Sequence, residues 1–339
     1  MRSKVSIVRC GSYDPAPLKR AIERSLDLIG GISRFVKPSD KVLVKPNLLS
    51  ARLPDEAVDT HPEFVRAVVR IVKEAGGVPS IGDSPGSFFT VKSINHVYEQ
   101  SGMKEVAENE GAGLVSFNQA VHINGYPIAR AIKEFDLVIN LPKFKTHAMA
   151  VLTGAVKNMY GLVPGLSKVQ YHKQAPNINE FSNVLADIFE ITKPALSIMD
   201  GIVGMDGDGP AAGRVREIGY ILSSGDAVSL DAAFADMAGV PYSRNKLLRT
   251  VTERGLGKGC LDDIEILGES LSSARIKDFK LPKTAPQNRA PSFIAKYIAR
   301  IIHFRPFINE SLCEKCLICK PACPVDAITI NKDKSIIDN

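Results

Sequence analysis

Short apolar runs rich in β-branched residues alternate with helix-period segments along most of this chain. That alternation is typical of an α/β domain with a mainly parallel sheet and flanking helices. The expected strands are Val5–Arg9, Lys41–Lys45, Val78–Ile81, Gly113–Phe117, Leu137–Leu141, Ala195–Met199, Ile218–Leu222 and Ile264–Leu267. The expected helices are Pro17–Ile29, Pro62–Glu74, Asn95–Glu108, Asn179–Thr192 and Ala227–Ala238. Ligands of open α/β sheets bind at the carboxyl ends of strands, so polar residues there are the first site candidates.

Two helix starts have capping signals. Thr60 precedes a first turn that contains Pro62 and Glu63, which predicts an N-cap at Thr60. Asp226 precedes the helix expected at Ala227–Ala238 and is a favourable cap.

The composition is that of an ordinary globular protein of 339 residues, long enough for a large and a small domain. Lys and Arg (43) exceed Asp and Glu (37) too little to indicate nucleic-acid binding. No apolar run is long enough to span a membrane, and the N-terminus lacks a signal-peptide pattern. We therefore expect a cytoplasmic protein with no transmembrane segment.

The chain divides into three parts. We expect an α/β domain over residues 1–280, a linker and docking helix over 281–307, and a small ferredoxin-like α+β module, incomplete if the chain is truncated, over 308–339. Pro291–Phe307 has apolar residues every four positions, which predicts one apolar stripe on a helix. Docking of the tail on the main domain explains that stripe better than a membrane-surface helix does.

Four cysteines lie close together near the C-terminus. Cys313, Cys316, Cys319 and Cys323, followed by Pro324, match the bacterial ferredoxin pattern C-x2-C-x2-C-x3-C-P. Thiolates two residues apart can wrap a cubane, whereas the cysteine pairs of zinc sites are usually a dozen or more residues apart. The four cysteines are therefore predicted to bind a [4Fe-4S] cluster.

The sequence leaves the identity of the fourth ligand of that cluster undecided. In two-cluster ferredoxins the last cysteine of a run binds the other cluster, and this chain has no second run. The chain also stops where a second run would follow, so we expect a truncated sequence with a second cluster in the full protein. On this geometry Cys323 does not complete the first cluster. The alternatives are a single cluster completed by Cys323, Cys10 or Cys260, with Cys260 favoured over Cys10, or one with an open iron site.

A stretch without acidic residues begins with the fifth expected strand, at Leu137. Residues 137–179 contain no Asp or Glu, although an even distribution would place about five there. Lys143, Lys145 and His147 follow the strand with period two, so an extended chain would direct all three to one side. Lys157 and Asn158 close a helical segment rich in small residues. We expect these cations to form a phosphate or carboxylate site.

Three other strand ends are polar: Lys45 with Asn47, Asp83, and Asp200. Each alone is ordinary turn chemistry, but together they predict one shared cleft. We expect Lys45, Asn47, Lys143, Lys145, Lys157 and Asn158 to bind an anionic ligand or cofactor, and Asp83, Asp200 and His147 to act as acid–base groups. Asp206 and Asp208 do not form an EF-hand, because Pro210 occupies the next ligand position and no Glu closes the loop. Nucleotide, metalloprotease and hydrolase motifs are absent.

Several of these motifs occur in the same order in a known family. Lys45-Pro46-Asn47, Gly82-Asp83-Ser84-Pro85, the run Leu141–His147, the run Thr153–Asn158 and the run Asp200–Gly204 resemble the domain-of-unknown-function family 362. The resemblance covers roughly residues 5–240 and the tail, since some members carry a C-terminal ferredoxin module. It implies no particular reaction. The chain departs from the ferredoxin-bearing pattern in lacking the second cysteine run.

Two functions fit these features. The favoured one is an iron–sulfur oxidoreductase that passes single electrons to an anionic substrate or cofactor in the cleft, with a redox partner protein. The alternative is a non-enzymatic electron carrier or assembly adaptor whose basic face docks an acidic partner. RNA binding is a weaker third hypothesis, because few aromatic residues lie in the acid-free stretch. A deep pocket lined by the lysines would favour the enzyme, and a flat basic face would favour docking.

Overall fold

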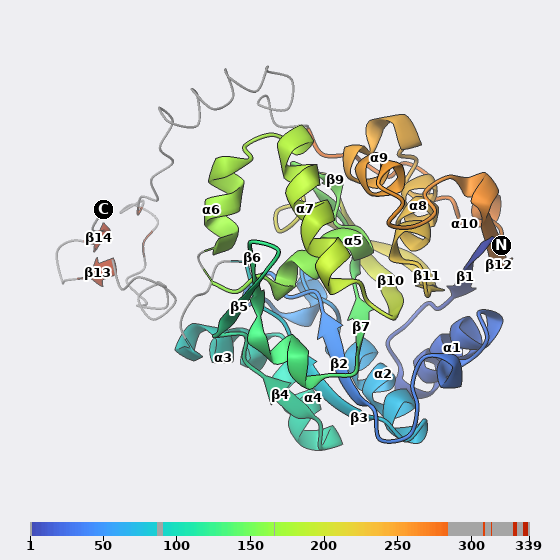
Figure 1. Ribbon diagram of the computed structural model, residues 1–339, viewed down its shortest axis with the longest axis horizontal. Coiled ribbons are helices and arrows are strands. Elements are labelled where there is room, and N and C mark those ends of the chain that lie inside the picture. Colours follow the sequence, from blue (N-terminus) through green and yellow to red (C-terminus); the bar gives the residue numbers. More distant parts are fainter. Residues whose placement is uncertain are drawn as a thin grey trace.

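A computed structural model describes residues 2–86, 91–165 and 167–283, together with Ile308, Cys313, 328–330 and 335–337 of the C-terminal region. The described residues up to 283 form an α/β domain with a mostly parallel sheet between two layers of helices (Figure 1). The expected fold class is therefore confirmed for this part of the chain.

The strands alternate with the helices along the sequence. The strands are β1 (Ser3–Arg9), β2 (Lys41–Pro46), β3 (Val78–Gly82), β4 (Gly113–Val115), β5 (Ala120–Ile123), β6 (Tyr126–Ala129), β7 (Leu137–Leu141), β8 (Lys143–His147), β9 (Val151–Leu152), β10 (Leu196–Asp206), β11 (Arg214–Ser224), β12 (Ile264–Gly268), β13 (Ile328–Ile330) and β14 (Ser335–Ile337).

The helices are α1 (Pro15–Leu28), α2 (Pro62–Glu74), α3 (Val91–Gln100), α4 (Met103–Glu110), α5 (Gly154–Asn158), α6 (Ser167–Gln174), α7 (Ile178–Thr192), α8 (Ala227–Met237), α9 (Lys246–Glu253) and α10 (Leu271–Ala274). Single 3-10 turns occur at Ile32–Arg34, Pro54–Glu56, Arg130–Glu134, Met159–Leu162, Tyr242–Arg244 and Leu261–Asp263.

The main sheet has the strand order β12-β1-β11-β10-β7-β2-β3-β4. Neighbours from β10 to β4 run parallel, and β11 is antiparallel to both β1 and β10. The chain leaves β7 through Pro142 and continues as β8, which pairs with the middle of β10. Because β2, β3 and β7 are parallel, their carboxyl ends meet at one edge, and β8 brings its side chains to the same edge.

Two apolar cores flank the sheet, as the alternation of side chains along a strand requires. Val42 and Val44 of β2 face one core and Leu43 faces the other. Helices α1 to α4 cover the first face, and α5, α7, α8 and α9 cover the second (Figure 1). The site edge is thus held from both sides by packed helices.

Most expected elements are present with boundaries that differ by a few residues. The helix expected at Asn95–Glu108 is split into α3 and α4 at Gly102, whose φ of 76° ends the helical path. Strands β10 and β11 each have 11 residues and extend beyond the sheet as a ribbon, so both are longer than predicted. Helices α6 and α9 were not predicted, because neither has flanking signals as clear as those of α2.

The two predicted caps differ in outcome. Asp226 caps α8 as expected and accepts hydrogen bonds from the amides of Val228 and Ser229. The cap of α2 is His61 rather than Thr60, and its Nδ1 accepts from the amide of Glu63. Thr60 instead joins the ends of β2 and β7, because its hydroxyl accepts from the Asn47 amide and donates to the Leu141 carbonyl.

The C-terminal region is described only in part. Strands β13 and β14 pair antiparallel with Ile328 opposite Ile337. The predicted docking helix at Pro291–Phe307 lies outside the described residues. None of the helices within the described ranges is both long and apolar enough to cross a membrane.

Candidate functional site

A cavity of about 170 Å³ opens at the carboxyl edge of the sheet. The segments after β2 and β3 form one wall, the end of β8 and helix α5 form the floor, and α6 lies across the opposite side. Its polar lining residues are Asn47, Asp83, Ser84, His147, Thr153, Lys157, Asn158, Tyr160, Lys168 and His172. The volume suits a small anion of a few heavy atoms, since a water in the liquid occupies about 30 Å³.

Lys45 and Asp83 form a fully buried ion pair behind this wall. Lys45 Nζ lies 2.8 Å from Asp83 Oδ1, and both side chains are almost inaccessible. The amides of Ser84 and Leu48 also donate to the Asp83 carboxylate, at 2.9 and 2.8 Å. Gly161 packs against the pair, and a Cβ there would lie 2.5 Å from Lys45 Nζ. The only carboxylate among the described lining residues is therefore already neutralised.

A chain of carboxamides links the strand ends to α5. Asn47 Nδ2 donates to Asn158 Oδ1 at 3.0 Å, and Asn158 Nδ2 donates to Asn140 Oδ1 at 2.8 Å. Asn140 continues the chain to the Ser197 hydroxyl of β10. Asn47 Oδ1 is buried and has no hydrogen-bond partner among the described residues. These contacts fix α5 against β2 and β7.

The lysines of the cavity differ in the contacts that compensate their positive charge. Lys168 Nζ donates to the carbonyl oxygens of Ser84 and Pro85. Lys157 Nζ, in contrast, makes no hydrogen bond or ion pair with any residue that the structure describes. Burial lowers the pKa of Lys168 to about 7. Burial, followed by the charges of Lys145, Lys168 and Lys45, lowers the pKa of Lys157 to about 7.

Both histidines of the cavity are neutral near pH 7. His147 Nδ1 accepts from the amides of Met149 and Ala150, at 3.1 and 3.2 Å. The ring proton therefore lies on Nε2, which leaves a donor for a ligand. Burial and Lys157 place the pKa of His147 well below its usual value. His172 stacks on Phe181, and burial with two nearby lysines lowers its pKa to about 4.

The cavity thus concentrates donors and cations without free counter-charge among the residues that line it. Each buried positive group must be compensated by an opposite charge or by loss of its proton. Lys45 is compensated by Asp83, and Lys157 and Lys168 by their lowered pKa. A bound anion would supply the missing charge.

Lys143 and Asp200 form a second buried ion pair. Lys143 Nζ lies 2.7 Å from Asp200 Oδ2 and 3.0 Å from the Tyr13 hydroxyl, which donates to Asp200 Oδ1 at 2.8 Å. The Tyr13 ring stacks on His61 with centroids 3.6 Å apart, and the His61 amide donates to Asp200. All groups of this cluster satisfy one another, as a structural tie between the N-terminal segment, α2 and β10 would require.

Lys145 lies between the two ion pairs. Its Nζ donates to the Val58 carbonyl next to Asp59, whose Oδ1 accepts from the Leu49 amide. Burial lowers the pKa of Lys145 to about 8 and raises that of Asp59 to about 7, against their mutual attraction. Lys145 therefore supports the wall of the cavity from behind.

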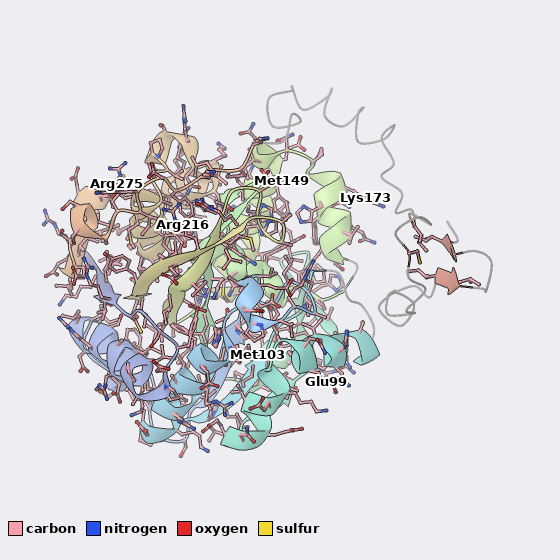
Figure 2. The ribbon with its side chains drawn as sticks, turned by 180° about the vertical axis from the view of Figure 1, so that it is seen from behind. Glu99, Met103, Met149, Lys173, Arg216 and Arg275 are labelled. Atoms are coloured by element: carbon pink, nitrogen blue, oxygen red, sulfur yellow. The ribbon has the colours of Figure 1, made fainter. Side chains whose placement is uncertain are left out.

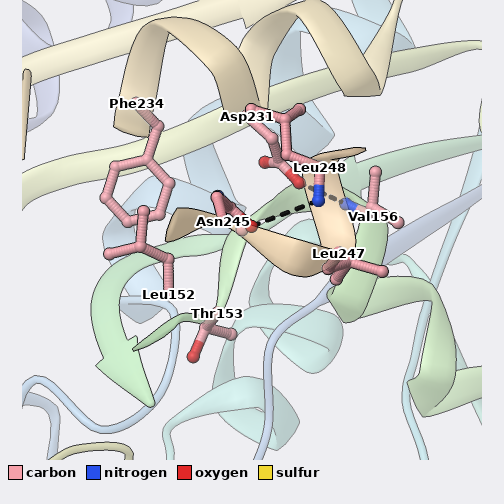
Figure 3. Close-up of a pocket in the computed structure, with 9 residues that line it drawn as sticks. Leu152, Thr153, Val156, Asp231, Phe234, Asn245, Leu247 and Leu248 are labelled. Atoms are coloured by element: carbon pink, nitrogen blue, oxygen red, sulfur yellow. Dashed lines mark hydrogen bonds between the residues drawn. The ribbon is translucent and has the colours of Figure 1, made fainter. Parts of the chain in front are cut away.

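Helix α5 is held by an acidic residue from another helix. Asp231 of α8 accepts from the amide of Ala155 at 2.5 Å. It also accepts from the amide of Val156 at 3.0 Å (Figure 3). Gly154 allows this approach, since its φ is 60° and a Cβ would lie 2.6 Å from Asp231 Oδ1. Burial raises the pKa of Asp231 to about 7. The cap sets the position of Lys157 and Asn158 in the cavity.

The predicted site residues therefore fall into two groups. Asn47, Asp83, His147, Lys157 and Asn158 line one cavity, with Lys45 directly behind it. Lys143, Lys145 and Asp200 do not line it; they are buried in internal contacts.

Several functional residues were not singled out from the sequence. Lys168 and His172 lie in the acid-free stretch, which was the available signal, but the helix that brings them to the cavity was not predicted. Tyr13, Asp59 and Asp231 had no sequence signal, because their roles depend on contacts between distant segments.

The metal-ligand prediction falls mostly outside the described residues. Cys316, Cys319 and Cys323 lie outside them, so the sulfur separations of the run that includes Cys313 stay a prediction. Cysteine thiolates in this spacing are typical ligands of [4Fe-4S] clusters. Elsewhere, Cys10 is buried and Cys260 is exposed. Asp206 is bound by Arg214 and Arg216, and the described ranges contain no group of three or more metal-ligating side chains.

An α/β domain with a lysine-lined cavity and a ferredoxin-type cysteine run defines an iron–sulfur protein with a basic cleft. The chain belongs to the family described as "Domain of unknown function (DUF362)", whose sequence model matches residues 42–236. The model of the 4Fe-4S binding domain matches residues 306–329. The resemblance seen in the sequence is thereby confirmed.

A relative has been described in a cyanobacterium. The chain is 36% identical over 244 residues to the "Thylakoid-associated protein sll1697" of Synechocystis sp. (strain ATCC 27184 / PCC 6803 / Kazusa). The match covers 70% of this chain and 75% of the relative, so it extends well beyond the cavity residues.

Proposed function

We propose that the protein is an iron–sulfur oxidoreductase that passes electrons to a small anionic substrate or cofactor held in the cavity. When bound, a [4Fe-4S] cluster supplies single electrons. The cavity residues supply binding and orientation: Lys157 and Lys168 attract the charge, and the Nε2–H of His147 donates a hydrogen bond.

The main support for this proposal is the positive charge of the cavity, which no free carboxylate among the described lining residues balances. Asp83 is the one carboxylate among the described lining residues, and Lys45 already neutralises it. Lys168 is 5% exposed, so this cation is turned inward rather than presented to a protein surface. A small ligand meets such a charge better than a docked acidic protein does, which favours the oxidoreductase over the electron carrier or adaptor. We keep a cytoplasmic location and a redox partner protein as further proposals.

The test begins with anaerobic purification and identification of co-purified small anions. The reduced protein is then mixed with each candidate, and recovery of its visible absorption is followed. We expect recovery to slow at least about tenfold in Lys157→Gln, because one charged contact contributes roughly 1.5–3 kcal/mol. The matched control is Lys173→Gln, since Lys173 is exposed on α6 (Figure 2). Equal rates in wild type and Lys157→Gln, together with capture of an acidic protein, would favour the adaptor.

A further inference from the structure

The amine of Lys157 differs from every other lysine of the site. Lys45 has Asp83, Lys143 has Asp200, and Lys168 has two carbonyl oxygens. Across the described ranges no such contact is found for Lys157 Nζ, although its side chain lines the cavity. No described acceptor therefore holds this nitrogen in one position or stabilises its charged form.

Its environment favours loss of that proton. Desolvation and three neighbouring lysine cations lower the pKa of Lys157 to about 7, so about half of it is the free amine at neutral pH. Burial next to other cations is a known way to activate a lysine as a nucleophile. Lys168 has a similarly lowered pKa, but its Nζ already donates to two carbonyl oxygens.

A hydrogen-bond donor lines the same cavity. His147 Nδ1 accepts two backbone hydrogen bonds, which leaves its proton on Nε2. Lys157 is the charged group that most affects His147, so the two side chains are neighbours. The amine of Lys157, a hydrogen-bond donor and the amine of Lys168 therefore lie around a space of about 170 Å³.

We propose that Lys157 forms an imine with the carbonyl carbon of a small anionic aldehyde or ketone, whose carboxylate or phosphate lies against Lys168. The inference rests on the proposed anion cavity and names the class of its ligand. Nζ attacks the carbonyl carbon and passes a first proton to the oxygen, and the Nε2–H of neutral His147 hydrogen-bonds to the hydroxyl of the resulting carbinolamine, which then takes up the second Nζ proton. The C–O bond then breaks, and the oxygen leaves as water with the two hydrogens lost from Nζ, so no electrons are exchanged.

The experiment traps the imine in the full-length protein. Wild type is incubated at pH 7 with glyoxylate and sodium cyanoborohydride, and the modified lysines are identified by peptide mass spectrometry. We expect Lys157 to be labelled at least about tenfold faster than the exposed Lys173, because an ordinary lysine is almost fully protonated at pH 7. Glycolaldehyde phosphate as a second probe separates a phosphate preference from a carboxylate preference. Acetaldehyde is the uncharged control.

Three results would overturn the proposal. Labelling of Lys157 no faster than that of Lys173 would exclude a reactive amine, and equal rates with acetaldehyde and glyoxylate would exclude anion recognition. The third is a Lys157 rate that excess inorganic phosphate does not lower. Calorimetry with inorganic phosphate distinguishes failure of the imine proposal from failure of the proposed function. If phosphate binds but Lys157 is not labelled, the anion cavity stands without the imine; if phosphate does not bind to wild type or to Lys157→Arg, the proposed function fails as well.

Discussion

A lysine without a counter-charge is unfavourable inside a protein unless it serves a ligand. Lys157 is half-buried, lines the cavity and has no counter-charge among the described residues, so its removal should weaken binding without weakening the fold. We expect Lys157→Gln to reduce the affinity for inorganic phosphate by about tenfold or more while the melting temperature stays equal or rises. Calorimetry and thermal unfolding measure the two effects. A loss of stability with unchanged affinity would show that Lys157 is structural.

Phosphate affinity should also depend on pH near neutrality. The pKa of both Lys157 and Lys168 is lowered to about 7 in the ligand-free protein, and a bound anion favours their charged forms. Apart from the titration of phosphate itself, which is the same for every variant, binding takes up protons at the lysines, and their contribution to the affinity should fall as the pH rises above 7, by up to about tenfold per pH unit for each lysine. Lys157→Gln should reduce this slope. Calorimetry from pH 6 to pH 9 gives the measurement, and an equal slope in both proteins would contradict the assignment.

The Lys45–Asp83 pair differs from Lys157, because each of its two charges is neutralised by the other. Asp83→Asn leaves Lys45 fully buried without a counter-charge, which should lower the free energy of unfolding by about 3–5 kcal/mol. Replacing both residues, as Lys45→Met with Asp83→Asn, should restore most of that loss. Denaturant unfolding of the single and double variants tests the coupling. Additive losses would mean that the two side chains do not act as a pair.

At the scale of elements, α5 illustrates how a very short helix can be fixed. Five residues do not form a stable helix alone, so Gly154–Asn158 depends on Asp231. We expect Asp231→Ala to lower the free energy of unfolding by about 1–2 kcal/mol and to weaken phosphate binding through displacement of Lys157. Asn245→Ala is the matched control, because Asn245 caps α9 at the neighbouring Leu248 amide (Figure 3). It should lose stability but keep its phosphate affinity.

The elements also explain how much of the site the sequence could predict. The alternation of strands and helices located β2, β3 and β7, and with them Asn47 and Asp83 at one edge. The period-two argument for Lys143, Lys145 and His147 could not anticipate that β8 pairs with β10, which buries Lys143 against Asp200. Local patterns define which residues share a face. The partner that covers that face can lie almost 60 residues away along the chain, as Asp200 does from Lys143. No local pattern identifies such a partner.

At the scale of the whole molecule, the cavity and the cysteine run should be separable. The cavity is lined by residues between Asn47 and His172, far from the cysteines in sequence. We expect Ser at Cys313, Cys316 or Cys319 to abolish the broad visible absorption after anaerobic reconstitution, while phosphate affinity stays within about twofold of wild type. Metal analysis and calorimetry measure both properties. Stoichiometric zinc without iron in the wild type would refute the cluster assignment.

Gly161 makes the Lys45–Asp83 pair depend on one position that can be compared among the sequences of the family. Because a Cβ at this position would collide with Asp83 and Lys45, no other residue type is compatible with the pair as it stands. A larger residue here would force Asp83 and Lys45 to shift, and with them the wall of the cavity. We therefore expect relatives that keep the buried pair to keep glycine at this position.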